Sequence, residues 1–163
     1  MIDEKAIKTR VAVYIRIGGS GDCIKSCEEQ KVHFNLLAAQ TPGWEIIDYY
    51  ADLGPSSRTQ PALKRLLADC EAGRVDLIVT KSISRISRSM PAMMEIARKL
   101  AFSKPPVGLY FEDTGLNTRN RDGFLMLAMC EAMAVQEGYN IPFAQFVKQM
   151  TRRKHEKRGE GNR

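Results

Sequence analysis

Three arginines that follow apolar runs are the residues of this chain best suited to chemistry. Arg85 and Arg88 stand three apart after the strand-like run Val75–Thr80, and Arg16 ends a second run, Val11–Ile17. The carboxyl ends of parallel strands meet at one edge of an open α/β sheet, where ligands bind. Arginine stays charged, and its planar guanidinium suits phosphate oxygens. We therefore expect the three side chains to converge on a phosphodiester or phosphate ester; a solvated basic loop is the alternative for Arg85 and Arg88.

Alternating strands and helices are expected to position these arginines. Apolar runs predict strands over 11–17, 44–51, 75–80 and 107–111, and helical spacing predicts helices over 24–40, 61–72 and 91–102. This order is typical of an α/β domain whose sheet is mostly parallel, with four or five strands flanked by helices. In the first helix, Val32, Leu36, Leu37 and Gln40 are expected to lie near one face.

Composition limits the classes of protein that the chain can represent. It has 163 residues, of which 44% are hydrophobic and 27% charged, so it fits one globular domain with its own core. No apolar run approaches the roughly 20 residues that span a membrane, and the polar start resembles no signal peptide. We expect no membrane partner and a cytoplasmic location. The net charge of +6 is compatible with nucleic acid.

The pattern changes near Asp122, where apolar residues keep helical spacing with no further strand. We expect two parts, an α/β domain over 1–121 and a long helix with a basic tail over 122–163, the helix kinked at 138–142 between Gly138 and Pro142. Its broad apolar face predicts packing against a second copy. In the tail, Arg152, Arg153 and Lys154 are expected either to contact DNA phosphates or to be solvated.

The four cysteines predict no metal site. Cys23 and Cys27 are four apart, but no matching Cys or His pair follows them. Cys70 and Cys130 lie in apolar helical patterns and are expected to be small core residues with free thiols.

Several motifs, in this order and spacing, resemble the N-terminal catalytic domain of serine site-specific recombinases, the resolvases and invertases. The resemblance covers about residues 9–140, the large-recombinase branch is the closer match, and it rests on Tyr14–Ile17, Ser26–Gln30, Leu63–Leu67, Asp76–Val79, Ser84–Arg88 and Leu109–Asp113. It implies a resolvase-like fold with a long dimerisation helix. It also implies a chemistry in which a serine hydroxyl attacks a DNA phosphodiester, forms a phosphoserine link and needs no metal or other cofactor.

The resemblance also implies roles for individual residues. Arginines of the family stabilise the charge that develops on the phosphoryl oxygens. By motif position, the arginines are Arg16, Arg85 and Arg88, the supporting residues are Gln30, Ser84 and Asp76, and Tyr14 braces the end of the first strand.

The chain departs from the family pattern at two positions of this site. The family nucleophile follows the arginine by two residues, and here Gly18 occupies that place. Glycine has no side chain and cannot attack. Ser20 is a displaced candidate between glycines, with a loop serine of no catalytic role as the alternative. The family arginine before the second helix is replaced by Gln60, and Arg58, two residues away, is a possible substitute.

Two functions from different classes follow from these departures. The first is the resolvase-type domain of a DNA recombinase, acting in recombination or integration of a mobile element, with cleavage impaired at Gly18. The second is a non-catalytic, DNA-associated regulatory or partner subunit derived from a recombinase. Both expect DNA as a partner, and a homodimer, a higher oligomer or a heteromer with an active recombinase. A phosphate-binding α/β domain unrelated to DNA is a third hypothesis. Family members carry a DNA-binding domain after the long helix, so a chain ending at Arg163 is expected to be a fragment or a shortened relative.

Overall fold

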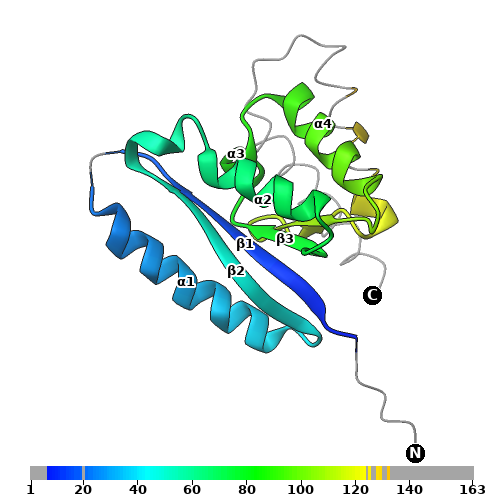
Figure 1. Cartoon of the computed structure of the whole chain (residues 1–163), viewed down its shortest axis with the longest axis horizontal. Helices are drawn as coiled ribbons and strands as arrows, with labels where there is room; N and C mark the ends of the chain where they lie inside the picture. The colour runs from blue at the N-terminus through cyan, green and yellow to red at the C-terminus, as the bar shows by residue number, and fades with distance from the viewer. Residues whose placement is uncertain (1–6, 20, 124, 126–127, 130–131, 133–163) are drawn as a thin grey trace, which may run out of the picture.

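The computed structural model describes residues 7–19, 21–123, 125, 128–129 and 132. In this part of the chain, strands and helices alternate (Figure 1). The elements in chain order are β1 (Thr9–Ile17), α1 (Cys23–Gln40), β2 (Trp44–Leu53), the 3₁₀ turn η1 (Gly54–Ser57), α2 (Pro61–Glu71), β3 (Leu77–Thr80), α3 (Ile83–Ile86), α4 (Met90–Ala101), β4 (Gly108–Phe111) and β5 (Leu116–Asn117).

One five-stranded sheet organises the domain. Its strand order is β2-β1-β3-β4-β5; β1 pairs in parallel with β2 and β3, β3 pairs in parallel with β4, and β5 is antiparallel to β4. The prediction of a mostly parallel sheet of four or five strands flanked by helices is confirmed. Because the parallel strands share a direction, their carboxyl ends lie at one edge of the sheet.

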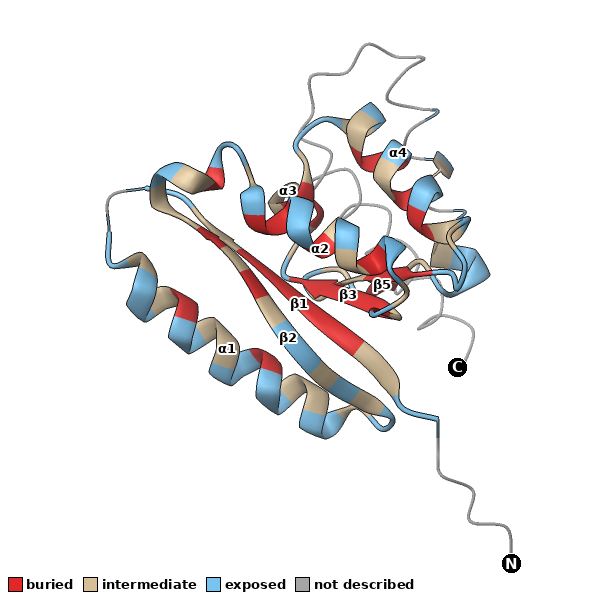
Figure 2. Cartoon of the chain, in the orientation of Figure 1, coloured by how far each residue is buried: buried red, intermediate tan, exposed pale blue. Residues whose placement is uncertain are grey.

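Helices cover both faces of the sheet, and alternate residues of β1 face opposite layers. Ala12 and Tyr14 pack in the core cluster that includes residues of α2 and α4, whereas Val11, Val13 and Ile15 pack in the cluster of α1. Figure 1 shows α1 on one side of β1 and β2, with α2 and α4 on the other, and Figure 2 shows β1 buried along most of its length. This two-sided burial explains why β1 reads as a continuous apolar run.

Three features of the secondary structure differ from those expected: the end of β2, the helix α3 and the strand β5. β2 continues through Asp52 and Leu53, beyond the expected strand over 44–51, because both residues pair with the end of β1. The basic stretch after β3 is not all loop: α3 forms there, with Ile83 and Ile86 buried. The short antiparallel strand β5 was not expected, and two residues carry too little periodicity to reveal it.

The apolar face that the sequence indicates on α1 is mostly not the face that the structure buries. Cys27 and Phe34, seven residues apart, are its buried residues, and Leu37 is half-buried. Val32 and Leu36 are 60% and 58% exposed. Apolar residues occupy more than one side of this helix, so the packing against the sheet, and not the helical spacing, decides which side is buried.

Most of the expected C-terminal helix lies outside the described residues, as do its kink, the basic tail and Cys130. Of its described residues, Ala128 packs against the core, and Leu125 and Met129 are exposed. Cys23, Cys27 and Cys70 are free thiols, and burial raises the pKa of Cys70 to about 12. Among the described helices, none has the length and apolar character needed to cross a membrane.

A matched pair of substitutions on α1 tests whether the helix packs against the sheet through the face that carries Phe34. Phe34→Ala should lower the free energy of unfolding by about 3–5 kcal/mol, because Phe34 is 2% exposed and its truncation leaves a cavity. Leu36→Ala removes an exposed side chain and should change it by no more than about 0.5 kcal/mol. Urea denaturation followed by circular dichroism measures both. Equal losses in the two variants would show that α1 packs through another face.

Candidate functional site

The structure brings Arg16 and Arg85 together at the carboxyl edge of the sheet. Arg16 is near the end of β1, and Arg85 reaches it from α3 by donating a hydrogen bond from Nη1 to the carbonyl oxygen of Arg16, at 2.9 Å. The Nε of Arg16 donates to the carbonyl oxygen of Ser57, at 2.8 Å. Both arginines are half-buried, so each is anchored by the backbone and still reaches solvent.

Arg88 and Ser84 belong to the basic stretch over residues 81–88, and their positions are set by α3. Arg88 lies just beyond the helix and is exposed. Ser84 is half-buried in α3, and its hydroxyl lies 3.1 Å from that of Ser82. Arg88 is therefore available to solvent three residues along the chain from Arg85, and its role at a phosphate stays a prediction.

Gly18 follows β1 at the same edge and is exposed. Its φ lies outside the left-handed region that favours glycine, whereas Gly19 has a φ of 101°. A Cβ at residue 18 would lie 3.3 Å from the Oγ of Ser57, so a side chain fits there if Ser57 yields by a few tenths of an ångström. Ser20, the displaced nucleophile candidate, lies outside the described residues.

Tyr14 and Asp52 form a buried pair behind this edge, and the sequence analysis did not single out Asp52. The Tyr14 hydroxyl donates to Asp52 Oδ2 at 2.8 Å. Asp52, 1% exposed, also accepts from the backbone N–H groups of Ala62 (2.9 Å) and Leu63 (3.1 Å) in the first turn of α2. Burial raises the pKa of Tyr14, so its hydroxyl keeps the proton that it donates. An aspartate at the end of an apolar strand, shortly before a proline-led helix, is the sequence signal that points to such a cap.

Gln60 occupies the position where the resemblance implies an arginine, and its side chain points inward. Its Nε2 donates to the Tyr14 hydroxyl (3.1 Å) and to the carbonyl oxygens of Ile86 (2.9 Å) and Arg85 (3.3 Å). Gln60 precedes α2 with a left-handed backbone, φ 50°, which is unfavourable for a residue with a Cβ. These contacts tie α2, β1 and α3 together. The residue therefore supports the fold of the site, and Arg58, which was offered in its place, is exposed at the end of η1.

Gln30 lies on α1 and makes no hydrogen bond or ion pair with Arg16 or Arg85. It lines a hollow of about 330 Å³ between α1 and the ends of β3 and β4, where His33 pairs with Glu112. The hollow is lined by Glu29, Gln30, His33, Phe34, Lys81, Glu112 and Asp113. Within the described part of the chain, no group of three or more His, Cys, Asp and Glu side chains is arranged to hold a metal ion.

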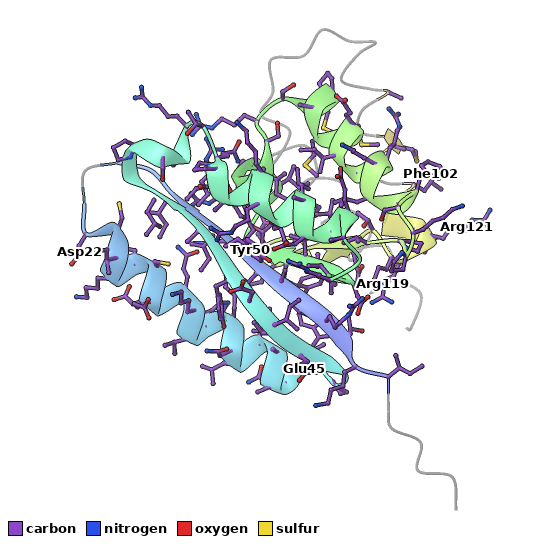
Figure 3. All side chains as sticks on the ribbon, viewed as in Figure 1. Asp22, Glu45, Tyr50, Phe102, Arg119 and Arg121 are labelled. Atoms are coloured by element: carbon purple, nitrogen blue, oxygen red, sulfur yellow. The ribbon has the colours of Figure 1, made fainter. Side chains whose placement is uncertain are left out.

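Asp76 does not lie with the arginines, so the expectation that it joins them is wrong. It precedes β3 at the opposite edge of the sheet and accepts hydrogen bonds from Arg10 N (2.8 Å), Nε (3.0 Å) and Nη2 (2.9 Å). Arg10 and Arg16 are six positions apart along β1, which is about 20 Å of strand. Figure 3 labels Asp22, which precedes α1, on the side where β1 ends, and Glu45, near the start of β2, on the side where β1 begins.

Comparisons with known proteins agree with this architecture. The family model for the resolvase N-terminal domain matches residues 11–159. Among curated proteins, none matches the chain. The fold is similar to the N-terminal catalytic domain of TP901-1 integrase (23% identity, TM-score 0.62, covering 79% of this chain and 96% of that one). It is also similar to a resolvase family site-specific recombinase from Streptococcus pneumoniae (21%, 0.57, 89% and 99%) and to the C-terminal catalytic domain of ISC1926 TnpA, an IS607-like serine recombinase (16%, 0.51, 88% and 96%).

The strand order, the helices on both faces and the arginines at the carboxyl edge define a resolvase-type α/β domain. Because the family model spans most of its length, the chain belongs to the resolvase N-terminal domain family, and the resemblance stated from the sequence is confirmed.

The contacts of Gln60 can be tested by replacing its amide. Gln60→Glu puts a carboxylate, which cannot donate, against the carbonyl oxygens of Arg85 and Ile86. We expect the free energy of unfolding to fall by about 1–3 kcal/mol in urea titrations at pH 7. The control Gln40→Glu changes an exposed residue at the end of α1 and should cost no more than about 0.5 kcal/mol. A Gln60→Glu variant as stable as this control would contradict the assigned contacts.

The pair Arg10–Asp76 predicts a pH dependence of stability. The hydrogen bond from Arg10 lowers the pKa of Asp76, so the folded state favours the ionised carboxylate. The stability that it contributes is present above the ordinary aspartate pKa of about 3.9 and is lost as pH falls through the lower folded value. Asp76→Asn should therefore be destabilising at pH 7, with a difference from the parent chain that shrinks below about pH 4. Asp48→Asn, at an exposed position, is the control; a difference that stays constant with pH would contradict the prediction.

Proposed function

We propose that this chain is the resolvase-type domain of a DNA recombinase that binds a DNA phosphodiester at the carboxyl edge of its sheet, and in which residue 18 does not supply the nucleophile. The observation that carries the proposal is the contact of Arg85 with Arg16, two residues before Gly18. Two guanidinium groups at one edge provide the charge that a phosphate ester requires. The structural relatives are described as an integrase and as recombinases, which supports DNA as the substrate.

Impaired strand cleavage follows from the side chain at residue 18 rather than from the fold. The backbone at Gly18 does not require glycine, and Arg16 is held in place. What the site lacks there is a hydroxyl to begin the attack. Arg88, exposed next to the site, is assigned to the same phosphate, and the tail arginines to the flanking DNA backbone.

A non-catalytic partner subunit is the second candidate, and Gly18 is the observation that favours it. A domain that keeps its phosphate-binding edge and loses the attacking group can occupy a site or pair with an active relative without cutting. Pairing through the segment after residue 122, as a homodimer or with an active recombinase, is part of this proposal.

Gly18→Ser tests the chemistry directly. The unmodified chain should form no covalent link with DNA, and Gly18→Ser should form one, because a serine there places a hydroxyl two residues after Arg16 on a backbone that accepts it. The measurement is a denaturing gel for a protein–DNA band, with nicked duplexes from the DNA that flanks the gene.

Gly21→Ser is the matched control, since a Cβ at that position meets nothing within 4 Å and its φ is not left-handed. It should give no band. A band from the unmodified chain that disappears in Ser20→Ala would show that Ser20 has taken over the attack, and no band from Gly18→Ser would count against the recombinase chemistry.

A further inference from the structure

Ser57 carries a hydroxyl that the fold does not use. The residue is 6% exposed and lies at the end of η1, where its carbonyl oxygen accepts the bond from Arg16 Nε. Its Oγ, however, makes no hydrogen bond to any residue that the structure describes. Every fully buried side-chain nitrogen or oxygen among those residues has a partner, so this hydroxyl must reach solvent. A hydroxyl that opens to solvent from a residue held this firmly is a donor available to a ligand.

The hydroxyl of Ser57 points into the space that a side chain at residue 18 would take. The distance from its Oγ to a Cβ at residue 18 would be 3.3 Å, closer than most real Cβ contacts. A serine at residue 18 would carry its own oxygen about 1.4 Å from that Cβ. The hydroxyl of Ser57 therefore reaches the region that the missing hydroxyl would occupy, although it comes from η1 and not from the loop after β1.

Arg16 supplies the charge next to this hydroxyl. Its Nε donates to the carbonyl oxygen of Ser57, while its terminal nitrogens make no hydrogen bond or ion pair with the described residues and can donate to a ligand. Because Nε contacts the same residue that carries the hydroxyl, the guanidinium and the Oγ lie within roughly 7 Å of each other. The oxygens of one phosphodiester can bridge two donors at that spacing.

We propose that Ser57 and Arg16 together form a phosphodiester-binding subsite, in which the Ser57 hydroxyl donates to a non-bridging phosphate oxygen at the place left empty by Gly18. The subsite binds the phosphodiester and does not cleave it. The inference rests on the proposed function for the identity of the ligand as a DNA phosphate. It adds a residue that no resemblance assigns.

Dimethyl phosphate, the simplest phosphodiester, tests the subsite without a DNA target. In an amide-correlation NMR titration of the full chain, it should shift the signals of residues 16–19 and 57. Ser57→Ala should raise its Kd about tenfold, since a hydrogen bond to a charged group is worth about 1.5 kcal/mol and each 1.4 kcal/mol is tenfold in Kd.

Ser56→Ala is the matched control, because the Ser56 hydroxyl donates to the carbonyl oxygen of Leu53 at 2.8 Å and is not aimed at residue 18. Its Kd should equal that of the parent chain. The Ser57 hydroxyl makes no hydrogen bond to a residue that the structure describes, so Ser57→Ala should keep the parent's dispersed spectrum; Ser57→Gly serves as a second variant with the same expected Kd.

Several outcomes would overturn the proposal. An unchanged Kd in both Ser57 variants would show that Arg16 binds without the hydroxyl. A phosphoryl adduct on Ser57 in intact-mass analysis after incubation with nicked DNA would show cleavage in place of binding. If Gly18→Ser links to DNA while the Ser57 variants bind dimethyl phosphate normally, the subsite fails and the recombinase proposal stands. If the Ser57 variants lose binding but Gly18→Ser gives no link to DNA, the subsite stands and the recombinase proposal fails.

Discussion

The carboxylate of Asp52 is shielded almost completely from water, and its need for hydrogen-bond donors is the constraint on which this domain depends. An ionised group in such a place costs several kcal/mol unless all its acceptor capacity is used. The Tyr14 hydroxyl and two N–H groups at the start of α2 meet this demand. The partial positive charge of a helix N-terminus adds to it. The end of β2, the middle of the sheet and the start of α2 are therefore fixed relative to one another.

The positions of Arg16 and Arg85 at the carboxyl ends of the strands follow from the way Asp52 caps the start of α2. Since α2 must begin over Asp52, the chain reverses at Gln60 with a left-handed backbone. The Gln60 amide then reaches the Tyr14 hydroxyl and the last carbonyl oxygens of α3. α3 in turn carries Arg85, which returns to the carbonyl oxygen of Arg16 on β1. The buried carboxylate of Asp52 thus helps to set, through a series of hydrogen bonds, where the half-buried Arg16 and Arg85 lie.

Fold and chemistry separate cleanly at residue 18. Nothing in the series of contacts behind the carboxyl ends of the strands involves a side chain there, and the φ of residue 18 does not require glycine. A domain of this family can therefore keep its sheet and its phosphate-directed arginines while it lacks a nucleophile at this position. The unused hydroxyl of Ser57 beside Gly18 shows that the edge still presents a donor, from a different element.

The sequence by itself determined the order of strands and helices, the parallel sheet and the family, because these depend on local periodicity and on motif spacing. It also grouped Arg16 with Arg85, since both follow strands that run in the same direction. Only the tertiary structure decided that Asp76 belongs to the far edge, where Arg10 lies beside it. Only the tertiary structure showed that Asp52, Gln60 and Ser57 lie behind the arginines. Their positions depend on residues up to 46 apart in the chain that come together when α2 and η1 close over β1, and no local pattern encodes such a contact.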